Sequence, residues 1–120
     1  MSIFVRLLFV VYLFSANALI ADTPDLQLNL ASGLSGVVDI NNAGDGSHRL
    51  FLVRQAGTVY ILEDGELNQT PFLDLRSRVS TVAEEQGLLS IEFAPDYATS
   101  GVLYVFYTGI GGGTVIDRLQ

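Results

Sequence analysis

The chain has 120 residues with a formal net charge of −7, and 49% of the residues are hydrophobic, which excludes an intrinsically disordered protein. Its 6 basic residues are all arginine and face 13 Asp and Glu, so the charge balance excludes a nucleic-acid binder that neutralises phosphates. The lack of cysteine in the sequence excludes disulfides, thiolate zinc sites and cysteine nucleophiles.

The segment 1–18 has the pattern of a secretory signal peptide. One early arginine precedes an apolar run over residues 7–14, and small residues then form an A-x-A site that ends at Ala18. This pattern predicts cleavage after Ala18, with Ala21 as the alternative. The apolar run is shorter than the ~20 residues of a membrane span, so we expect no stable span after cleavage. The mature chain, residues 22–120, is expected to be periplasmic or secreted.

Two halves of the mature chain repeat one strand pattern at a distance of about 50 residues. Each half reads as strand, turn, strand, turn, strand, and the first half adds a strand-like piece. The Asp64-Gly65 pair in the first half predicts a hairpin turn in which both residues have positive φ. The matched segments are 38–40 with 91–93, 50–53 with 103–106 and 57–61 with 113–116, and the added piece is 71–75.

This repeat favours an all-β fold built from propeller blades, because a blade has four short strands and such a period. Strands that are apolar on both sides suit sheets covered on both faces, as stacked blades are. A β-sandwich and a chance similarity between strand-rich segments are the alternatives. A propeller needs roughly four to eight blades, and about one and a half to two are present, so we expect an N-terminal part of a longer domain. Alone it would be marginally stable with exposed strand edges.

Several segments resemble the glucose/sorbosone dehydrogenase family. Residues 30–40 and 44–57 look like the opening of that family, and residues 71–75 are similar to its outer strand. The most specific segment is 85–97, which reads EQGLLSIEFAPDY and is followed by LYVFYT at residues 103–108. Together they resemble the family signature GLLG-apolar-A-F-H-P-D-Y … YVYYT, with Ala in place of the turn His.

The resemblance implies a six-bladed propeller that oxidises an aldose sugar at its C1 hydroxyl. Hydride would pass to pyrroloquinoline quinone (PQQ), calcium would be the second cofactor, and an external acceptor would take the electrons. In the family the catalytic His and the cofactor and calcium ligands lie on later blades, so the catalytic, cofactor-binding and metal residues are expected outside this chain. Glu85 stands where soluble glucose dehydrogenases have Gln beside the sugar. Glu85 and Gln86 are therefore the expected substrate-binding residues.

The connections of a four-stranded blade alternate between its two ends, which predicts two rims of loops. We expect residues 55–57, 81–86 and 108–113 on one rim, and a ligand site on that rim would make Glu84, Glu85 and Gln86 candidates. Residues 41–48 and 94–100 are expected on the opposite rim.

His48, a calcium-loop-like segment and a non-catalytic function are the alternatives to this interpretation. His48, the only histidine, follows a Gly-rich turn and is expected to be an exposed turn residue rather than a base. Asp39-x-Asn41-x-x-Gly44 resembles a calcium loop, but Ala43 and Leu50 stand where oxygen ligands are needed, which excludes it. Because a fold does not determine a function, the alternative is a non-catalytic extracytoplasmic propeller that binds a protein or a carbohydrate.

Overall fold

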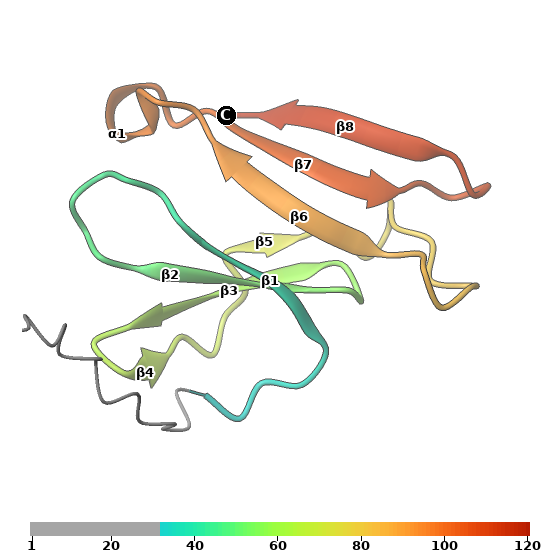
Figure 1. The fold of residues 1–120 in the computed structure, drawn as a ribbon, viewed down its shortest axis with the longest axis horizontal. Helices are drawn as coiled ribbons and strands as arrows, with labels where there is room; N and C mark the ends of the chain where they lie inside the picture. The colour runs from blue at the N-terminus through green and yellow to red at the C-terminus, as the bar shows by residue number, and fades with distance from the viewer. Residues whose placement is uncertain (1–31) are drawn as a thin grey trace, which may run out of the picture.

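The computed structural model describes residues 32–120 and has two antiparallel β-sheets and one short helix there (Figure 1). The first sheet has the strand order β1-β2-β3-β4, with β5 also paired to β3, and the second has the order β6-β7-β8. The predicted signal peptide and its cleavage sites lie outside the described residues. The elements are β1 Val37–Asn42, β2 Leu50–Arg54, β3 Thr58–Glu63, β4 Glu66–Leu67, β5 Leu73–Asp74, β6 Leu88–Phe93, α1 Tyr97–Ser100, β7 Leu103–Thr108 and β8 Thr114–Leu119.

The hairpin between β3 and β4 confirms the predicted Asp-Gly turn. Asp64 and Gly65 have φ angles of 50° and 82°, the positive values that this tight turn needs. The predicted strand at 71–75 is shorter than expected, because only Leu73–Asp74 pairs as a strand. β4 pairs with the end of β3 and β5 with its start, so the segment between them turns and interrupts the fourth strand.

The two halves do repeat, but their register differs from the predicted one. A β-bulge follows the first residue of β1, and a bulge follows the first residue of β6 at the same place. The pairings that come after the bulges make Ile40 equivalent to Ile91 and Val59 equivalent to Ile116. The predicted match was two residues off in the first strand and one residue off in the third. Because both repeats carry the bulge at the equivalent place, the offsets come from the connections. Residues 94–102 between β6 and β7 are two more than residues 43–49 between β1 and β2, and the β7–β8 hairpin is longer than the β2–β3 hairpin.

The hydrophobic core lies between the two sheets. Phe51 of β2 is fully buried and packs its ring against Phe93 of β6, with ring centroids 4.6 Å apart. The amide of Asn41 in β1 donates a hydrogen bond of 2.8 Å to the carbonyl oxygen of Ile91 and so links the two sheets directly. The other core residues are Ala43, Val53, Val59, Ile61, Leu75, Val79, Leu88, Ile91, Leu103, Val105 and Tyr107.

The all-β fold class is confirmed as two stacked antiparallel sheets, neither of which closes on itself. The faces turned away from the core retain apolar side chains, with Tyr104, Phe106 and Ile116 exposed on the second sheet and Ile40 and Leu50 on the first. Between residues 32 and 120 there is no helix long and apolar enough to cross a membrane.

Candidate functional site

Three loops meet at one end of the sheets and form a surface that we call the loop rim, made of residues 55–57, 80–86 and 109–113. The β7–β8 hairpin and the segment that leads into β6 lie at the same end in Figure 1. A hollow of about 340 Å³ lies between the first two loops, and a second of about 250 Å³ lies between the second loop and the glycines of the third. The predicted grouping of these loops on one rim is confirmed.

Gln55 fixes the second loop of the rim to the end of β2. Its side-chain amide donates hydrogen bonds to the carbonyl oxygens of Glu84 and Gln86, at 2.5 and 2.9 Å. The carbonyl oxygen of Gln55 accepts a 2.9 Å bond from the backbone N–H of Leu88. Gly87 lies against this residue with φ of +148°, and any Cβ there would collide with Gln55. Only glycine at position 87 therefore allows the backbone before β6 to lie this close to Gln55.

Gln86 ties the same loop to the segment that precedes it. Its side-chain oxygen accepts a 2.6 Å hydrogen bond from the hydroxyl of Ser80, and the N–H of Ser80 donates to the carbonyl of Thr108 at 2.8 Å. The third loop joins through an isolated bridge between Val79 and Gly109. The second loop and the segment before it are therefore bonded to both of the other loops, which holds the backbone of the rim in place.

The outward side chains of the rim are apolar and acidic. Val82 is 94% exposed and Ile110 is 75% exposed, although both side chains are hydrophobic. Glu84 and Glu85 beside Val82 are exposed, and no cation lies within ion-pair distance of either among the described residues. In the part of the chain that the structure describes, no cluster of three or more His, Cys, Asp or Glu side chains is arranged to hold a metal ion. The rim is suited to contact with another molecule.

The two residues predicted to bind substrate differ in their placement. Gln86 lines both hollows, and its side-chain oxygen is taken up by Ser80. Glu85 is exposed on the rim but lines neither hollow. Their role in binding a ligand stays a prediction. Val82 and Ile110 were placed on this rim from the sequence but not singled out as contact residues, because their only signal there is an apolar residue inside a polar or Gly-rich loop.

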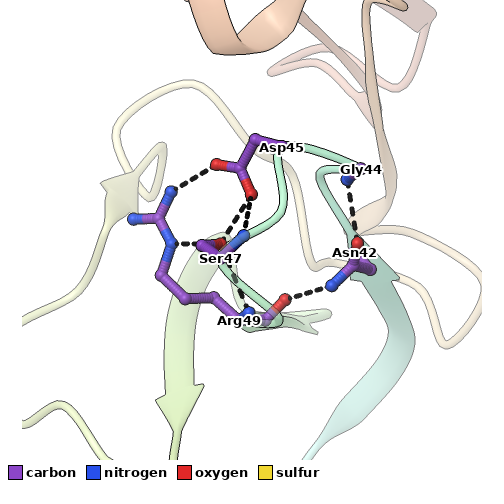
Figure 2. Close-up of polar contacts among 5 residues, drawn as sticks. All are labelled: Asn42, Gly44, Asp45, Ser47 and Arg49. Carbon is purple, nitrogen blue, oxygen red and sulfur yellow. Dashed lines mark hydrogen bonds and ion pairs between the residues drawn. The ribbon is translucent and has the colours of Figure 1, made fainter.

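The opposite rim holds a compact polar network in the β1–β2 loop (Figure 2). The carboxylate of Asp45 accepts hydrogen bonds from the N–H and hydroxyl of Ser47 at 3.0 and 2.6 Å, and it pairs with the guanidinium of Arg49 at 2.8 Å. Asn42 closes the loop by accepting from the N–H of Gly44 and donating to the carbonyl of Arg49. Arg49 also lies over the ring of Phe51, 5.3 Å from its centroid.

Within this loop the acidic groups are already satisfied. The hydrogen bonds from Ser47 and Arg49 lower the pKa of Asp45 to about 2, which makes it a poor proton acceptor near neutral pH. In β1, the Asp39 carboxylate accepts from the Asn41 amide at 2.7 Å. His48 is exposed with φ of 59°, as expected of a turn residue.

Comparison with known proteins gives two related matches. No family model matches the chain. The chain is similar to the Hedgehog-interacting protein of Mus musculus, with 46% identity over 81 residues, and to that of Homo sapiens, with 42% identity over 83 residues. These matches cover 64% and 66% of this chain but only 12% of each relative, so the chain spans a small part of their length.

These matches overturn the predicted membership of the glucose/sorbosone dehydrogenase family. The relatives carry the name of a protein that interacts with Hedgehog, so the predictions of a sugar oxidoreductase, an aldose substrate and an external electron acceptor are wrong. PQQ and calcium stay untested. The segments that suggested the family, such as 85–97 and 103–108, mostly form strands, turns and the core between the sheets. Residues with these structural roles indicate how the sheets pack and do not identify a reaction.

Proposed function

We propose that the chain is part of a non-catalytic, extracellular protein-binding domain in which the two sheets are neighbouring blades of a β-propeller. The observation that carries the proposal is the 46% identity over 81 residues to a protein named for its interaction with Hedgehog. The predicted signal peptide supports an extracellular location. Of the two ligands in the alternative interpretation, a protein or a carbohydrate, the similarity favours a protein, and a Hedgehog protein is the proposed partner.

The loop rim is the proposed binding surface. Its backbone is held by the hydrogen bonds of Gln55 and Gln86, so little conformational entropy would be lost on binding. Val82 and Ile110 offer apolar contact area, and Glu84 and Glu85 flank it with negative charge. A partner that fits has an apolar patch bordered by Lys or Arg, because complementary charges speed association and orient the two surfaces.

The test measures binding of a purified Hedgehog protein to the immobilised full chain by biolayer interferometry. The double variant E84K/E85K is expected to weaken binding at least about tenfold, mostly through slower association at low salt. The matched control E63K/E66K makes the same charge change in the β3–β4 hairpin, outside the rim, and is expected to bind within about twofold of the original chain.

Two outcomes separate the parts of the proposal. If the unaltered chain does not bind the Hedgehog protein, the proposed partner is wrong. If it binds, but E84K/E85K and E63K/E66K reduce binding equally, the partner stands and the assignment of the loop rim is wrong. Val82→Asp provides a second probe of the rim, because it introduces charge at a side chain that is 94% exposed and makes little contact within the fold.

A further inference from the structure

The sequence contains one N-glycosylation motif that the loop rim does not use. Asn68-Gln69-Thr70 fits the pattern N-x-[ST] with a middle residue other than proline, and no other asparagine of the chain has Ser or Thr two residues later. Such a motif accepts a glycan only where the transferring enzyme can reach it, which in exported proteins means a surface loop. Its place in the fold therefore decides whether it can be used.

The motif lies in a segment that loops out from the edge of the first sheet. β4 and β5 both pair with β3, but the residues between them, 68–72, stand opposite only residues 60–61 of β3. The extra residues cannot all join the ladder, so they are displaced from it as in a bulge. The N–H groups of Asn68 and Phe72 anchor the two ends to carbonyl oxygens of β3 at 2.9 and 2.8 Å. In Figure 1 this segment joins β4 to β5.

The side chains of the motif are available to another molecule. Asn68, Gln69 and Thr70 are all exposed. Within the described part of the chain, Asn68 uses its backbone N–H for the bond to β3, and its side-chain amide makes no hydrogen bond. The Gln69 amide donates to the carbonyl of Leu67 at 3.1 Å and so does not occupy its neighbours. No bond within residues 32–120 has to break before the Asn68 amide can react.

The edge that carries the motif stays accessible in a ring of stacked blades. Blades contact one another through the faces of their sheets, whereas β4 stands last in the strand order of the first sheet, beyond β3. Residues 68–72 belong neither to the loop rim nor to the polar network of the opposite rim. An unpaired sheet edge invites pairing with other chains. A glycan at this place covers the edge and leaves the stacked faces and the loop rim free.

We propose that Asn68 is an N-glycosylation site. Its Nδ2 atom attacks C1 of an oligosaccharide carried on a polyprenyl pyrophosphate. The new bond joins Nδ2 to C1, the bond from C1 to the pyrophosphate oxygen breaks, and Nδ2 gives up one proton while the polyprenyl pyrophosphate leaves with the bonding electrons. This inference rests on the extracellular location in the proposed function, but it is independent of the Hedgehog partner and of the loop rim.

The test expresses the full chain, with its own residues 1–18, in mammalian cells. Intact-mass spectrometry of the chain from medium and cell lysate, before and after peptide-N-glycosidase treatment, is expected to show one glycan that the enzyme removes. N68Q and T70A should lose this mass increase completely, whereas T70S keeps a hydroxyl and should retain it. The matched control N29Q removes an asparagine outside any motif and should carry the glycan as the original chain does.

Pro71 directly follows the motif and restricts the backbone of Thr70 to extended conformations. Occupancy of the original chain is therefore expected to be partial and to rise in P71A. An original chain that loses its signal segment but carries no glycan would overturn this inference and leave the proposed function standing, and a glycan on P71A alone would assign that failure to Pro71. A chain that keeps its signal segment and carries no glycan would overturn both this inference and the extracellular location.

Discussion

Replacement of Gly87 by alanine tests whether the close approach to Gln55 holds the loop rim together. Gly87 has φ of +148°, and a Cβ at this position would lie 2.5 Å from the carbonyl oxygen of Gln55 and also collide with its Cγ. Gln55 cannot give way freely, because its carbonyl accepts from Leu88 and its side chain donates to Glu84 and Gln86.

The expected cost of G87A follows from these contacts. A non-glycine residue in such a backbone conformation costs about 2 kcal/mol. Displacement of the Gln55 side chain would also break its two hydrogen bonds to Glu84 and Gln86, at about 1 kcal/mol each. The free energy of unfolding should therefore fall by about 4 kcal/mol, a large share of the roughly 5–15 kcal/mol of a typical domain. Urea unfolding followed by far-UV circular dichroism measures this change through the transition midpoint.

Gly44 provides the matched control for this prediction. It has φ of +66°, but a Cβ there would meet nothing within 4 Å, so G44A carries the backbone strain alone. The expected loss for G44A is about 1 kcal/mol. The reasoning is refuted if G87A and G44A destabilise the chain equally, because the contact with Gln55 would then contribute nothing. Hydrogen exchange gives a second readout, since G87A should expose the amide of Thr108, which donates to the Gly87 carbonyl.

Three further predictions concern the opposite rim and the core. The pKa of Asp45 is lowered from 3.8 to about 2, so its contribution to the free energy of unfolding is complete above pH 3.8 and is lost as the pH falls toward 2. Between these pH values the free energy of unfolding measured by urea titration should therefore fall less for D45N than for the original chain. N41A should lower the free energy of unfolding by about 1–2 kcal/mol, since it removes the hydrogen bonds of the Asn41 amide. N41D should lower it further, because a carboxylate would face the Asp39 carboxylate and the Ile91 carbonyl. Equal urea midpoints for the two variants would contradict this. The hydroxyl of Thr58 is buried without a hydrogen-bond partner, so T58V should leave thermal stability unchanged or raise it by about 1 kcal/mol, and a clear loss would reveal a missed partner.

Local patterns were sufficient for the features that depend on neighbouring residues. The Asp64-Gly65 turn was predictable because a two-residue hairpin requires positive φ, which Asp tolerates and Gly favours. The grouping of residues 55–57 with 81–86 and 108–113 followed from the alternation of loops along antiparallel strands. The register of the repeat was not predictable, because the connections between equivalent strands differ in length and the apolar pattern of the strands does not fix that length.

The function was assigned wrongly because strand and turn segments were read as signs of a particular chemistry. Residues 85–97 include Leu88, Ile91 and Phe93, which are buried and serve the packing of the sheets. Side chains selected for packing recur wherever such sheets stack, so they identify an architecture and leave the ligand open. The exposed residues Val82 and Ile110 carry more information about a partner, but their exposure appears only once the loops are folded.

Composition, turn residues and strand periodicity alone settled that this is an acidic all-β chain with a repeated unit, since these properties act over a few residues. Tertiary structure decided which face of each strand is buried, because that depends on the bulges and on the sheet that lies opposite. It also decided that Gln55 and Gln86 support the rim through hydrogen bonds while Glu84 and Glu85 remain exposed, since contacts between distant segments set which side chains reach solvent.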